Sequence, residues 1–203
     1  MNKSKIISSQ WDHENNFHLA SDPSRLKKII NHYEIFKLSK DVKGDILEFG
    51  VFKGNSLIRF LTYNSLISNS KKKIYGFDTF SKFPISGDND DIEFIKVFEK
   101  DSGSSISKKD LDYFLKRKKF KNYKLIEGDI FKTLPNFIKN HNIKISFLHI
   151  DVDIYKPTLM ILENLFNKIN KNGILLLDDY KIIKGETRAV DDFFLKNNIK
   201  KNF

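Results

Sequence analysis

The sequence contains no cysteine, and this absence excludes disulfide bonds, thiolate metal sites and a cysteine nucleophile. Any bound metal ion would therefore need oxygen or imidazole ligands. Long hydrophobic runs are also absent: no stretch approaches the ~18 apolar residues that cross a bilayer, and the N-terminus lacks the apolar core of a signal peptide. We therefore expect a cytoplasmic protein that does not interact with membranes.

Alanine is rare and occurs only at positions 20 and 189, whereas lysine and asparagine occur along the whole chain. The formal net charge is +10, and a positive field attracts polyanions such as nucleic acids. The even spread of the lysines fits a general compositional bias better. The densest basic stretch, residues 116–121, falls between an expected helix and an expected strand, so we interpret it as a solvated turn and expect no nucleic-acid partner.

A chain of 203 residues, 40% of them hydrophobic, suits one globular domain with a sizeable core. Residues 1–43 are expected to form an N-terminal segment and a helix that packs on this core. The helix has its cap at Ser21-Asp22-Pro23 and runs to about residue 40. Its apolar face, at three- and four-residue spacings, is predicted to consist of Leu26, Ile29, Ile30, Tyr33 and Phe36.

From residue 44 to residue 203, short apolar runs alternate with helical patterns, which is typical of an α/β fold with a mostly parallel sheet flanked by helices. The predicted strands are residues 46–49, 73–77, 123–126, 145–150 and 174–177. The predicted helices are residues 55–67, 130–139, 157–169 and 188–196.

Residues 81–107 interrupt this alternation with Pro84, Gly87, Gly103 and an acidic run. Insertions of this length near strand ends commonly form lids or binding loops. We interpret the segment as a lid over the substrate, with a merely decorative loop as the alternative.

The first predicted strand leads into a glycine-containing turn, Glu48-x-Gly50-x-x-x-Gly54-x-Ser56. Glycines let the backbone turn tightly and approach a ligand at the start of the next helix, although the sterics of the turn alone can also require them. The spacing is not the G-x-G-x-x-G of a dinucleotide site. We therefore predict that this turn binds a different nucleotide-type ligand.

Two further acids follow later strands of the predicted sheet. Asp78 ends the second strand, where a carboxylate can accept hydrogen bonds from both hydroxyls of a ribose. Asp129 follows the third strand and is predicted either to reach an adenine amino group or to cap the helix that begins nearby. The two roles of Asp129 are compatible with each other.

The strongest signal is a set of acids after the fourth and fifth predicted strands. Adjacent parallel strands end at the same edge of a sheet, so Asp151, Asp178 and Asp179 are expected to converge. Like charges gathered in this way repel, and a bound cation relieves the repulsion. Oxygen ligands suit Mg²⁺, so these three acids are predicted metal ligands, with solvated loop acids as the alternative.

Three other polar residues near these strand ends are given structural roles. Asp153 is assigned to the start of the following helix instead of the metal site. His149 is expected to be packed and hydrogen-bonded, and Arg188 is expected to form a surface salt bridge.

Six segments of the chain together resemble the macrocin O-methyltransferase-like enzymes, which methylate sugar hydroxyls in antibiotic pathways. The segments are GDILEFGVFKGNS, YGFDTFSKFP, EGDIFKTLP, FLHIDVDIYKPT, NGILLLDDY and RAVDDFF. They cover about residues 44–195 in the same order and at suitable spacing. The resemblance implies a Rossmann-like class I methyltransferase fold that uses S-adenosylmethionine (SAM) and Mg²⁺.

Carried onto matching positions, the resemblance implies that the glycine-containing turn and Asp78 bind the cofactor. It also implies that Asp151, Asp178 and Asp179 bind the metal, and that Asp151 is the general base that deprotonates a sugar hydroxyl. The chain departs from the family pattern at residues 152–158. The acceptor therefore need not be a macrolide.

Folds of this kind usually finish with two further strands that form an antiparallel edge, whereas this chain stops soon after the helix at residues 188–196. Either the form is shortened or the hairpin is missing, and an exposed sheet edge would favour a homo-oligomer. Two rival functions stay open: a catechol-type phenol O-methyltransferase and a noncatalytic SAM-binding protein. The set of convergent acids argues against the second, because a pure binder does not need it.

Overall fold

The computed structural model describes residues 9–67, 72–84 and 88–200, and its centre is one five-stranded sheet in the order β3-β2-β1-β4-β5. Every adjacent pair of strands is parallel, which confirms the predicted α/β class. The strands are β1 Asp45–Phe49, β2 Ile74–Asp78, β3 Tyr123–Glu127, β4 Ile145–Ile150 and β5 Ile169–Leu177. Through residue 200, no strand follows β5 in the described part of the chain.

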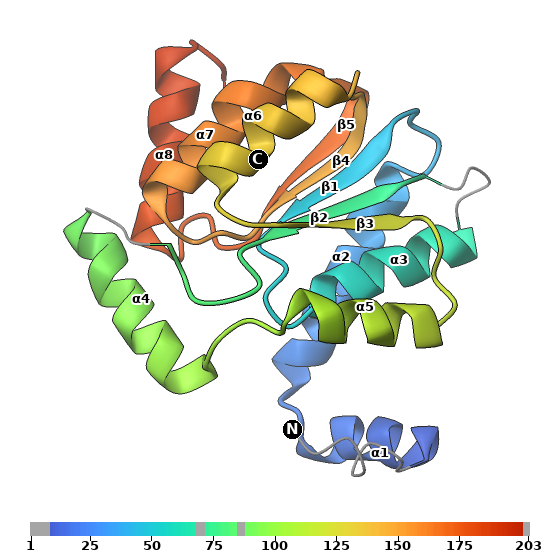
Figure 1. Ribbon diagram of the computed structural model, residues 1–203. Coiled ribbons are helices and arrows are strands. Elements are labelled where there is room, and N and C mark those ends of the chain that lie inside the picture. The colour runs from blue at the N-terminus through green and yellow to red at the C-terminus, as the bar shows by residue number, and fades with distance from the viewer. Residues whose placement is uncertain (1–8, 68–71, 85–87, 201–203) are drawn as a thin grey trace.

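Helices cover both faces of the sheet (Figure 1). One face carries α2 Pro23–Leu38, α3 Asn55–Ile67 and α5 Lys108–Arg117. The other face carries α6 Ile130–Asn140, α7 Tyr155–Leu165 and α8 Lys184–Lys196, with the short 3₁₀ helix Phe166–Lys168 after α7. The predicted helices over residues 55–67 and 130–139 therefore form where the apolar spacing placed them.

The central strands β1 and β4 are buried on both faces, so their side chains alternate between two separate cores. Leu47 and Phe49 of β1 pack toward α6, α7 and α8, whereas Ile46 packs toward α2 and α3. Glu48 has the same parity as Ile46, and it lies opposite His149 in the register of β1 and β4. The alternation therefore places these two polar residues together, inside the core on the α2 and α3 side.

The predicted apolar face of α2 is wrong in part. Leu26 and Ile30 are 42% and 52% exposed, whereas His32 and Phe36 are buried. The helix packs against α3 and β5 with a face that includes the polar His32 and the partly buried Lys28. Lys28 and His32 both contact Asp178 at the end of β5, and these polar contacts turn this face of the helix toward the sheet.

The N-terminal helix α1, Gln10–Ala20, was not predicted from the sequence. It begins at a capping box in which the Ser9 hydroxyl and the Asp12 carboxylate each accept a hydrogen bond from the other's backbone N–H. None of its residues is buried, and Figure 1 shows it apart from the sheet. Local capping, which carries no hydrophobic period, is therefore what defines it.

Among the described segments, no helix combines the length and apolar character needed to span a membrane.

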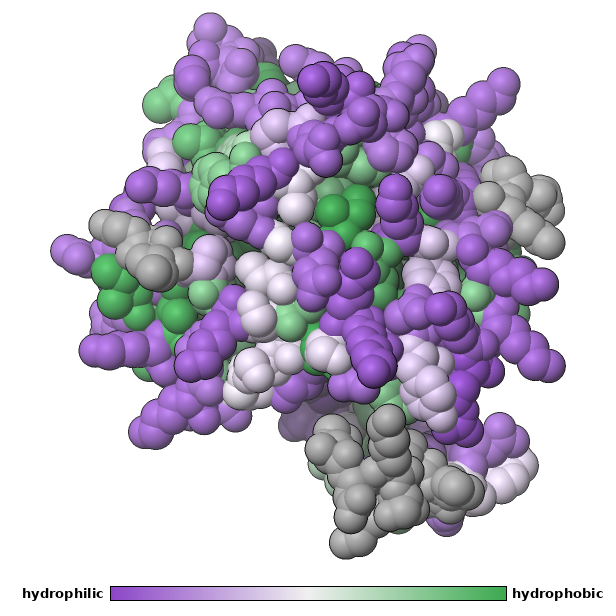
Figure 2. All heavy atoms as spheres, viewed as in Figure 1, coloured by the Kyte–Doolittle hydropathy of each residue, from purple (hydrophilic) through white to green (hydrophobic). Residues whose placement is uncertain are grey.

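The predicted lid segment contains a helix, α4 Asn89–Ser102, and residues 85–87 of that segment lie outside the described residues. α4 contacts α8 and presents Phe94 and Phe98 to Phe83, with ring centroids 6.2 and 5.5 Å apart. In Figure 2 most of the visible face is hydrophilic, and a small group of apolar side chains gathers over α4. The described part of the segment therefore forms an aromatic cluster between Phe83 and α4, and its role as a lid stays a prediction.

Candidate active site

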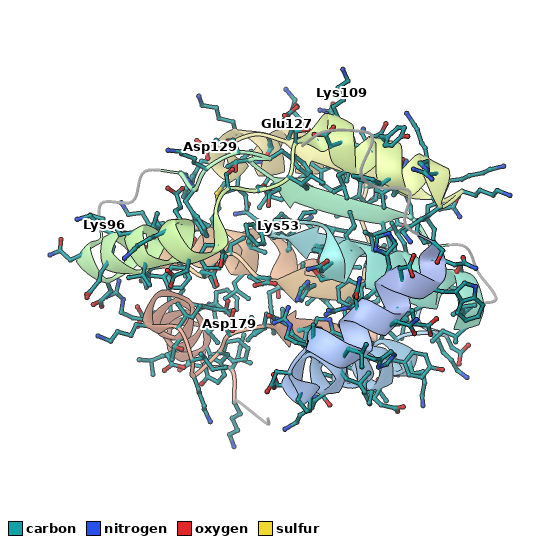
Figure 3. All side chains as sticks on the ribbon, turned by 90° about the horizontal axis from the view of Figure 1, so that it is seen from below. Lys53, Lys96, Lys109, Glu127, Asp129 and Asp179 are labelled. Atoms are coloured by element: carbon teal, nitrogen blue, oxygen red, sulfur yellow. The ribbon has the colours of Figure 1, made fainter. Side chains whose placement is uncertain are left out.

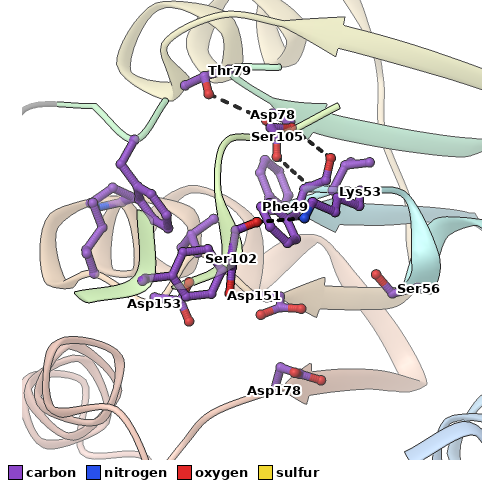
Figure 4. Close-up of a pocket in the computed structure, with 18 of the residues that line it drawn as sticks. Phe49, Lys53, Ser56, Asp78, Thr79, Ser102, Ser105, Asp151, Asp153 and Asp178 are labelled. Carbon is purple, nitrogen blue, oxygen red and sulfur yellow. Dashed lines mark hydrogen bonds between the residues drawn. The ribbon is translucent and has the colours of Figure 1, made fainter. Parts of the chain in front are cut away.

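A cavity of about 460 Å³ opens beyond the carboxyl ends of the strands, which is the usual position of ligand sites in parallel sheets. It is lined by the turn after β1, the loops after β2, β4 and β5, the start of α2 and the aromatic side of α4. Figure 4 shows Asp78, Asp151, Asp153 and Asp178 around this space. The volume is sufficient for a nucleotide-sized ligand.

The glycine-containing turn lies at the floor of the cavity, and both of its glycines have positive φ angles, +88° for Gly50 and +83° for Gly54. A Cβ on Gly50 would overlap the carbonyl oxygen of Asp151, and one on Gly54 would clash with the Leu111 side chain. Steric requirements of the fold therefore explain both glycines. Gly50 and Ser56 line the cavity, whereas Glu48 and Gly54 are not among the described residues that do.

Asp78 reaches the cavity from the end of β2, and backbone amides fix its carboxylate. One oxygen accepts a hydrogen bond from the Phe52 N–H at 2.8 Å, and the other accepts one from the Phe80 N–H at 2.6 Å. A carboxylate has about four lone-pair sites, so it can still accept hydrogen bonds from a ligand. The structure therefore presents Asp78 to the cavity as an oriented acceptor.

Asp129 caps α6, because its carboxylate accepts a hydrogen bond from the Phe131 N–H at 2.9 Å. Its neighbours Gly128 and Ile130 line the cavity, but Asp129 is not among the lining residues. Figure 3 shows Asp129 and Asp179 well apart, with Lys53 between them in that view. The capping role of Asp129 is confirmed, and a contact with adenine stays a prediction.

Three acids form a tight group at the ends of β4 and β5. Asp151, Asp153 and Asp179 each bring a carboxylate oxygen within 4.8 Å of the others. Burial, and then the charge of Asp178, raises the pKa of both Asp151 and Asp179 above the ordinary value. Asp153 was assigned to the start of α7, but the N-cap there is Ile154, and Asp153 lies buried in this group, which we call the acid triad.

Glu186 of α8 adds a fourth acid that the sequence analysis did not identify. It is fully buried; one of its oxygens accepts a hydrogen bond from the Asp179 N–H at 3.2 Å, and the other has no hydrogen-bond partner among the described residues. Burial, together with the charges of Asp151 and Asp179, raises its pKa to about 8. A helix position three residues into α8 carries no signal of proximity to strand ends, so the sequence alone could not have revealed it.

Asp178 follows β5 directly but belongs to a different set of contacts. Its oxygens contact the Lys28 ammonium, His32 Nε2 at 3.2 Å and His149 Nε2 at 3.4 Å. Burial opposes its ionisation, but the hydrogen bonds from His149, His32 and Lys28 outweigh burial and hold the pKa of Asp178 well below its usual range. Asp178 lines the same cavity as Asp151 and Asp179, but its carboxylate groups with His32 and His149 instead of with the acid triad, so its charge is matched by basic groups.

His149 links this set to β1. Its Nδ1 lies 3.2 Å from the Glu48 carboxylate, and the ring is fully buried. Burial works against the charged form, but Asp178 and Glu48 on either side raise the pKa of His149 to about 10. The expectation of a packed, hydrogen-bonded histidine is confirmed, and Glu48 acts here as its partner. We call the chain of contacts from Lys28 and His32 through Asp178 and His149 to Glu48 the buried network.

The acid triad fits a hard divalent cation. Carboxylate oxygens are the ligands that Mg²⁺ prefers, and the unpartnered Glu186 oxygen lies beside them without a proton donor of its own. The turn after β1 and the oriented Asp78 likewise fit a nucleoside-bearing cofactor.

Arg188 forms the predicted salt bridge, and its partner is Asp88. Its guanidinium also lies 3.7 Å from the Asp90 carboxylate and over the Tyr155 ring.

Two curated proteins are similar in sequence. The demethyldecarbamoylnovobiocin O-methyltransferase of Streptomyces niveus is 25% identical over 169 residues, covering 80% of this chain and 62% of its own length. The 8-demethyl-8-(2,3-dimethoxy-alpha-L-rhamnosyl)-tetracenomycin-C 4'-O-methyltransferase of Streptomyces olivaceus is 23% identical over 152 residues, covering 71% and 56%. The chain therefore spans less than two thirds of the length of either relative.

Two solved structures share the architecture. The O-methyltransferase NovP superposes with a TM-score of 0.72 and 21% identity, covering 87% of this chain and 74% of that chain. The calicheamicin methyltransferase CalS11 superposes with a TM-score of 0.65 and 22% identity, covering 93% and 79%. The predicted Rossmann-like methyltransferase fold is therefore confirmed.

One family description accounts for nearly the whole chain. The family described as Macrocin-O-methyltransferase (TylF) matches residues 21–203, a span that includes α2, the turn after β1, the acid triad and Glu186. The resemblance inferred from the six segments is thus confirmed, and the chain belongs to the macrocin O-methyltransferase family.

Proposed function

We propose that the chain is a SAM-dependent O-methyltransferase that acts on a hydroxyl of a sugar or a glycosylated small molecule. The observation that carries this proposal is a single cavity lined both by the turn after β1 with Asp78 and by the acid triad. The names of similar proteins support it: both curated relatives are O-methyltransferases, and one is named for a rhamnosyl-bearing substrate.

The cofactor would lie across the ends of β1 and β2. Asp78 would accept hydrogen bonds from the ribose hydroxyls with the lone pairs that the Phe52 and Phe80 amides leave free. Gly128 lines the same cavity and donates its backbone N–H to the Asp78 carbonyl oxygen at 3.0 Å, whereas Figure 4 shows Ser56 away from Asp78, on the side of Lys53 and Asp151. When bound, SAM supplies an electrophilic methyl group on a sulfonium sulfur.

Asp151 and Asp179 are the proposed core of a Mg²⁺ site, as expected from the sequence, and Asp153 is the third donor that lies nearest to them. Asp178 would join them by giving up its contact with Lys28. When bound, Mg²⁺ supplies Lewis acidity that lowers the pKa of a hydroxyl beside it. The acids themselves hold the acceptor oxygen near the methyl donor, which reduces the entropic part of the barrier.

Asp151 is the proposed general base. Burial, and then the charge of Asp178, raises its pKa, which makes its carboxylate a stronger proton acceptor than an exposed one. The acids would direct the acceptor oxygen toward the methyl carbon of bound SAM, which would supply both the electrophilic carbon and a neutral thioether as the leaving group. The hydroxyl proton passes to Asp151, and no covalent enzyme intermediate is needed.

The aromatic side of the cavity would accommodate the apolar part of the acceptor. Phe52, Phe83, Phe94 and Phe98 all line the cavity, and the Phe52 and Phe98 rings lie 5.2 Å apart. Such a surface can stack on a sugar ring or on an aromatic aglycone. It therefore supports a glycosylated acceptor and is also compatible with the catechol-type rival.

The test is acceptor profiling. The chain is incubated with SAM and Mg²⁺ against a panel of nucleotide sugars, glycosides and diphenols, and products are read by mass spectrometry as the gain of one methylene unit. We expect gains on sugar-bearing acceptors. Gains confined to diphenols would establish the catechol-type alternative, and calorimetric SAM binding without any gain would establish a noncatalytic binder.

A further inference from the structure

The cavity has one wall, between the starts of α2 and α3, where hydrogen-bond donors outnumber acceptors. Arg25 of α2 and Arg59 of α3 both line it, as does Ser56. Within residues 9–67, 72–84 and 88–200, none of these three side chains has a hydrogen-bond or ion-pair partner. Their donors therefore face the cavity without an acceptor from the protein.

The lack of a hydrogen-bond or ion-pair partner is energetically unfavourable for Arg59 because of its position. Its side chain is partly buried, and desolvation lowers the pKa of the guanidinium, an effect that the like charge of Arg25 adds to. The charges of Asp178 and Glu48 act on Arg59 in the opposite direction, but neither carboxylate contacts it. Two neighbouring guanidinium groups held apart from any carboxylate are the arrangement that a bound oxyanion stabilises.

The use of arginine in this chain is selective. The sequence has 36 basic residues, of which only four are arginines, at positions 25, 59, 117 and 188. Arg188 is bound to Asp88, and Arg117 lies over the Tyr113 ring at 5.8 Å. The other two line the same cavity. The planar fork of arginine binds carboxylate and phosphate in a bidentate way that lysine cannot reproduce.

From these observations we propose that Arg25, Arg59 and Ser56 form an oxyanion subsite that binds a carboxylate or phosphate group of a substrate. The inference rests on the proposed function for the identity of the substrates. One source of the oxyanion is the methionine carboxylate of SAM, and the other is a phosphate on a nucleotide-linked sugar acceptor. Both present the same chemistry to the two arginines.

The experiment is calorimetry with matched pairs of probes on the wild-type chain and the variants Arg59→Gln and Arg25→Gln. The first pair is SAM and decarboxylated SAM, which differ only at the carboxylate. The second pair is thymidine 5′-diphosphate and thymidine. We expect each variant to weaken the binding of one oxyanion-bearing probe by about 10- to 100-fold, whereas the binding of its partner without the oxyanion should change little. Loss confined to the first pair assigns the subsite to the cofactor, and loss confined to the second assigns it to the acceptor.

The variant Arg117→Gln is the matched control, because it removes an arginine outside the cavity. Arg25 is exposed, so Arg25→Gln tests the subsite even if Arg59→Gln unfolds, and Arg59→Lys should restore only part of the affinity. Unchanged affinity of SAM and of thymidine 5′-diphosphate in both Gln variants overturns the subsite. That result leaves methyl transfer untouched, whereas a chain that methylates nothing but binds an oxyanion through these arginines loses the proposed function and keeps the subsite.

Discussion

The acid triad and the buried network lie side by side at the carboxyl end of the sheet, but their charges are balanced in different ways. In the buried network, Glu48 and Asp178 each contact a basic group, with His149 between them. In the acid triad, Asp151, Asp153 and Asp179 lie against one another, and none of them forms an ion pair with a basic side chain in the described part of the chain. The same residue type at adjacent strand ends is therefore neutralised internally in one region and left uncompensated in the other.

This difference indicates which region serves the fold and which serves chemistry. Buried charges that are paired cost little to keep, whereas removing one partner leaves an uncompensated charge. Carboxylates that crowd without a cation raise one another's pKa and lower the stability of the empty protein. Substitutions in the buried network should therefore lower the stability of the protein, whereas the acid triad should tolerate substitutions that remove a charge.

The largest expected effect is the loss of His149. The variant His149→Leu would leave Glu48 and Asp178 as buried carboxylates without their shared base, so we expect the free energy of unfolding to fall by about 3–5 kcal/mol. Denaturant unfolding measures this change. His18→Leu, at an exposed position of α1, is the control and should change stability by less than about 0.5 kcal/mol. A His149→Leu variant as stable as this control would mean that the network is not charged.

A dependence of stability on pH should follow in size. The folded pKa of Glu186 is about 8 against an ordinary 4.5, and that of His149 is about 10 against 6.5. Both values are raised, so both groups contribute stability fully below their ordinary pKa and lose it as the pH rises through the folded value. From pH 6.5 to 8, each group should cost on the order of 1 kcal/mol per pH unit. Unfolding curves across that range in Glu186→Gln should show a shallower decline, and an equally steep one would contradict the assignment to Glu186.

The smallest effect has the opposite sign. In the metal-free protein, Asp153→Asn removes one of three mutually repelling carboxylates, and we expect the free energy of unfolding to rise by about 0.5–2 kcal/mol. Thermal unfolding in the presence of a chelator measures this. The exposed Asp41→Asn is the matched control and should have no measurable effect. A clear loss of stability in Asp153→Asn would show that the acid triad is structural, like its neighbour.

The sequence predicted the strand ends well because apolar runs mark β1 to β5, and parallel strands must bring Asp78, Asp151 and Asp178 to one edge. It could not predict which acids would be neutralised. That outcome depends on Lys28 and His32, which lie outside the apolar face predicted for this helix. The contacts with Asp178, and not the apolar spacing of α2, determine which face of this helix is buried. They turn Lys28 and His32 toward the sheet and leave Leu26 and Ile30 exposed.

Glu186 and Asp153 were missed for a related reason. Glu186 lies in α8, and only the return of this helix to the end of β5 brings its carboxylate to the Asp179 N–H. Asp153 was assigned to a helix start, but its backbone has a left-handed φ of +64° and its carbonyl oxygen accepts a hydrogen bond from the Glu186 N–H at 2.9 Å. A tertiary contact between the loop after β4 and the first turn of α8 accompanies this conformation, and no local pattern signals such a contact.

The most direct test of the central claim is calorimetric titration of Mg²⁺ into the chain saturated with S-adenosylhomocysteine. We expect one binding site in the wild-type chain and a loss of at least about tenfold in affinity in Asp179→Asn and Asp151→Asn, since each removes a carboxylate donor. Asp129→Asn, outside the cavity, should bind as the wild type does. Absence of Mg²⁺ binding in the wild type, or unchanged affinity in both acid-triad variants, would contradict the assignment of these acids to a metal-assisted methyl-transfer site.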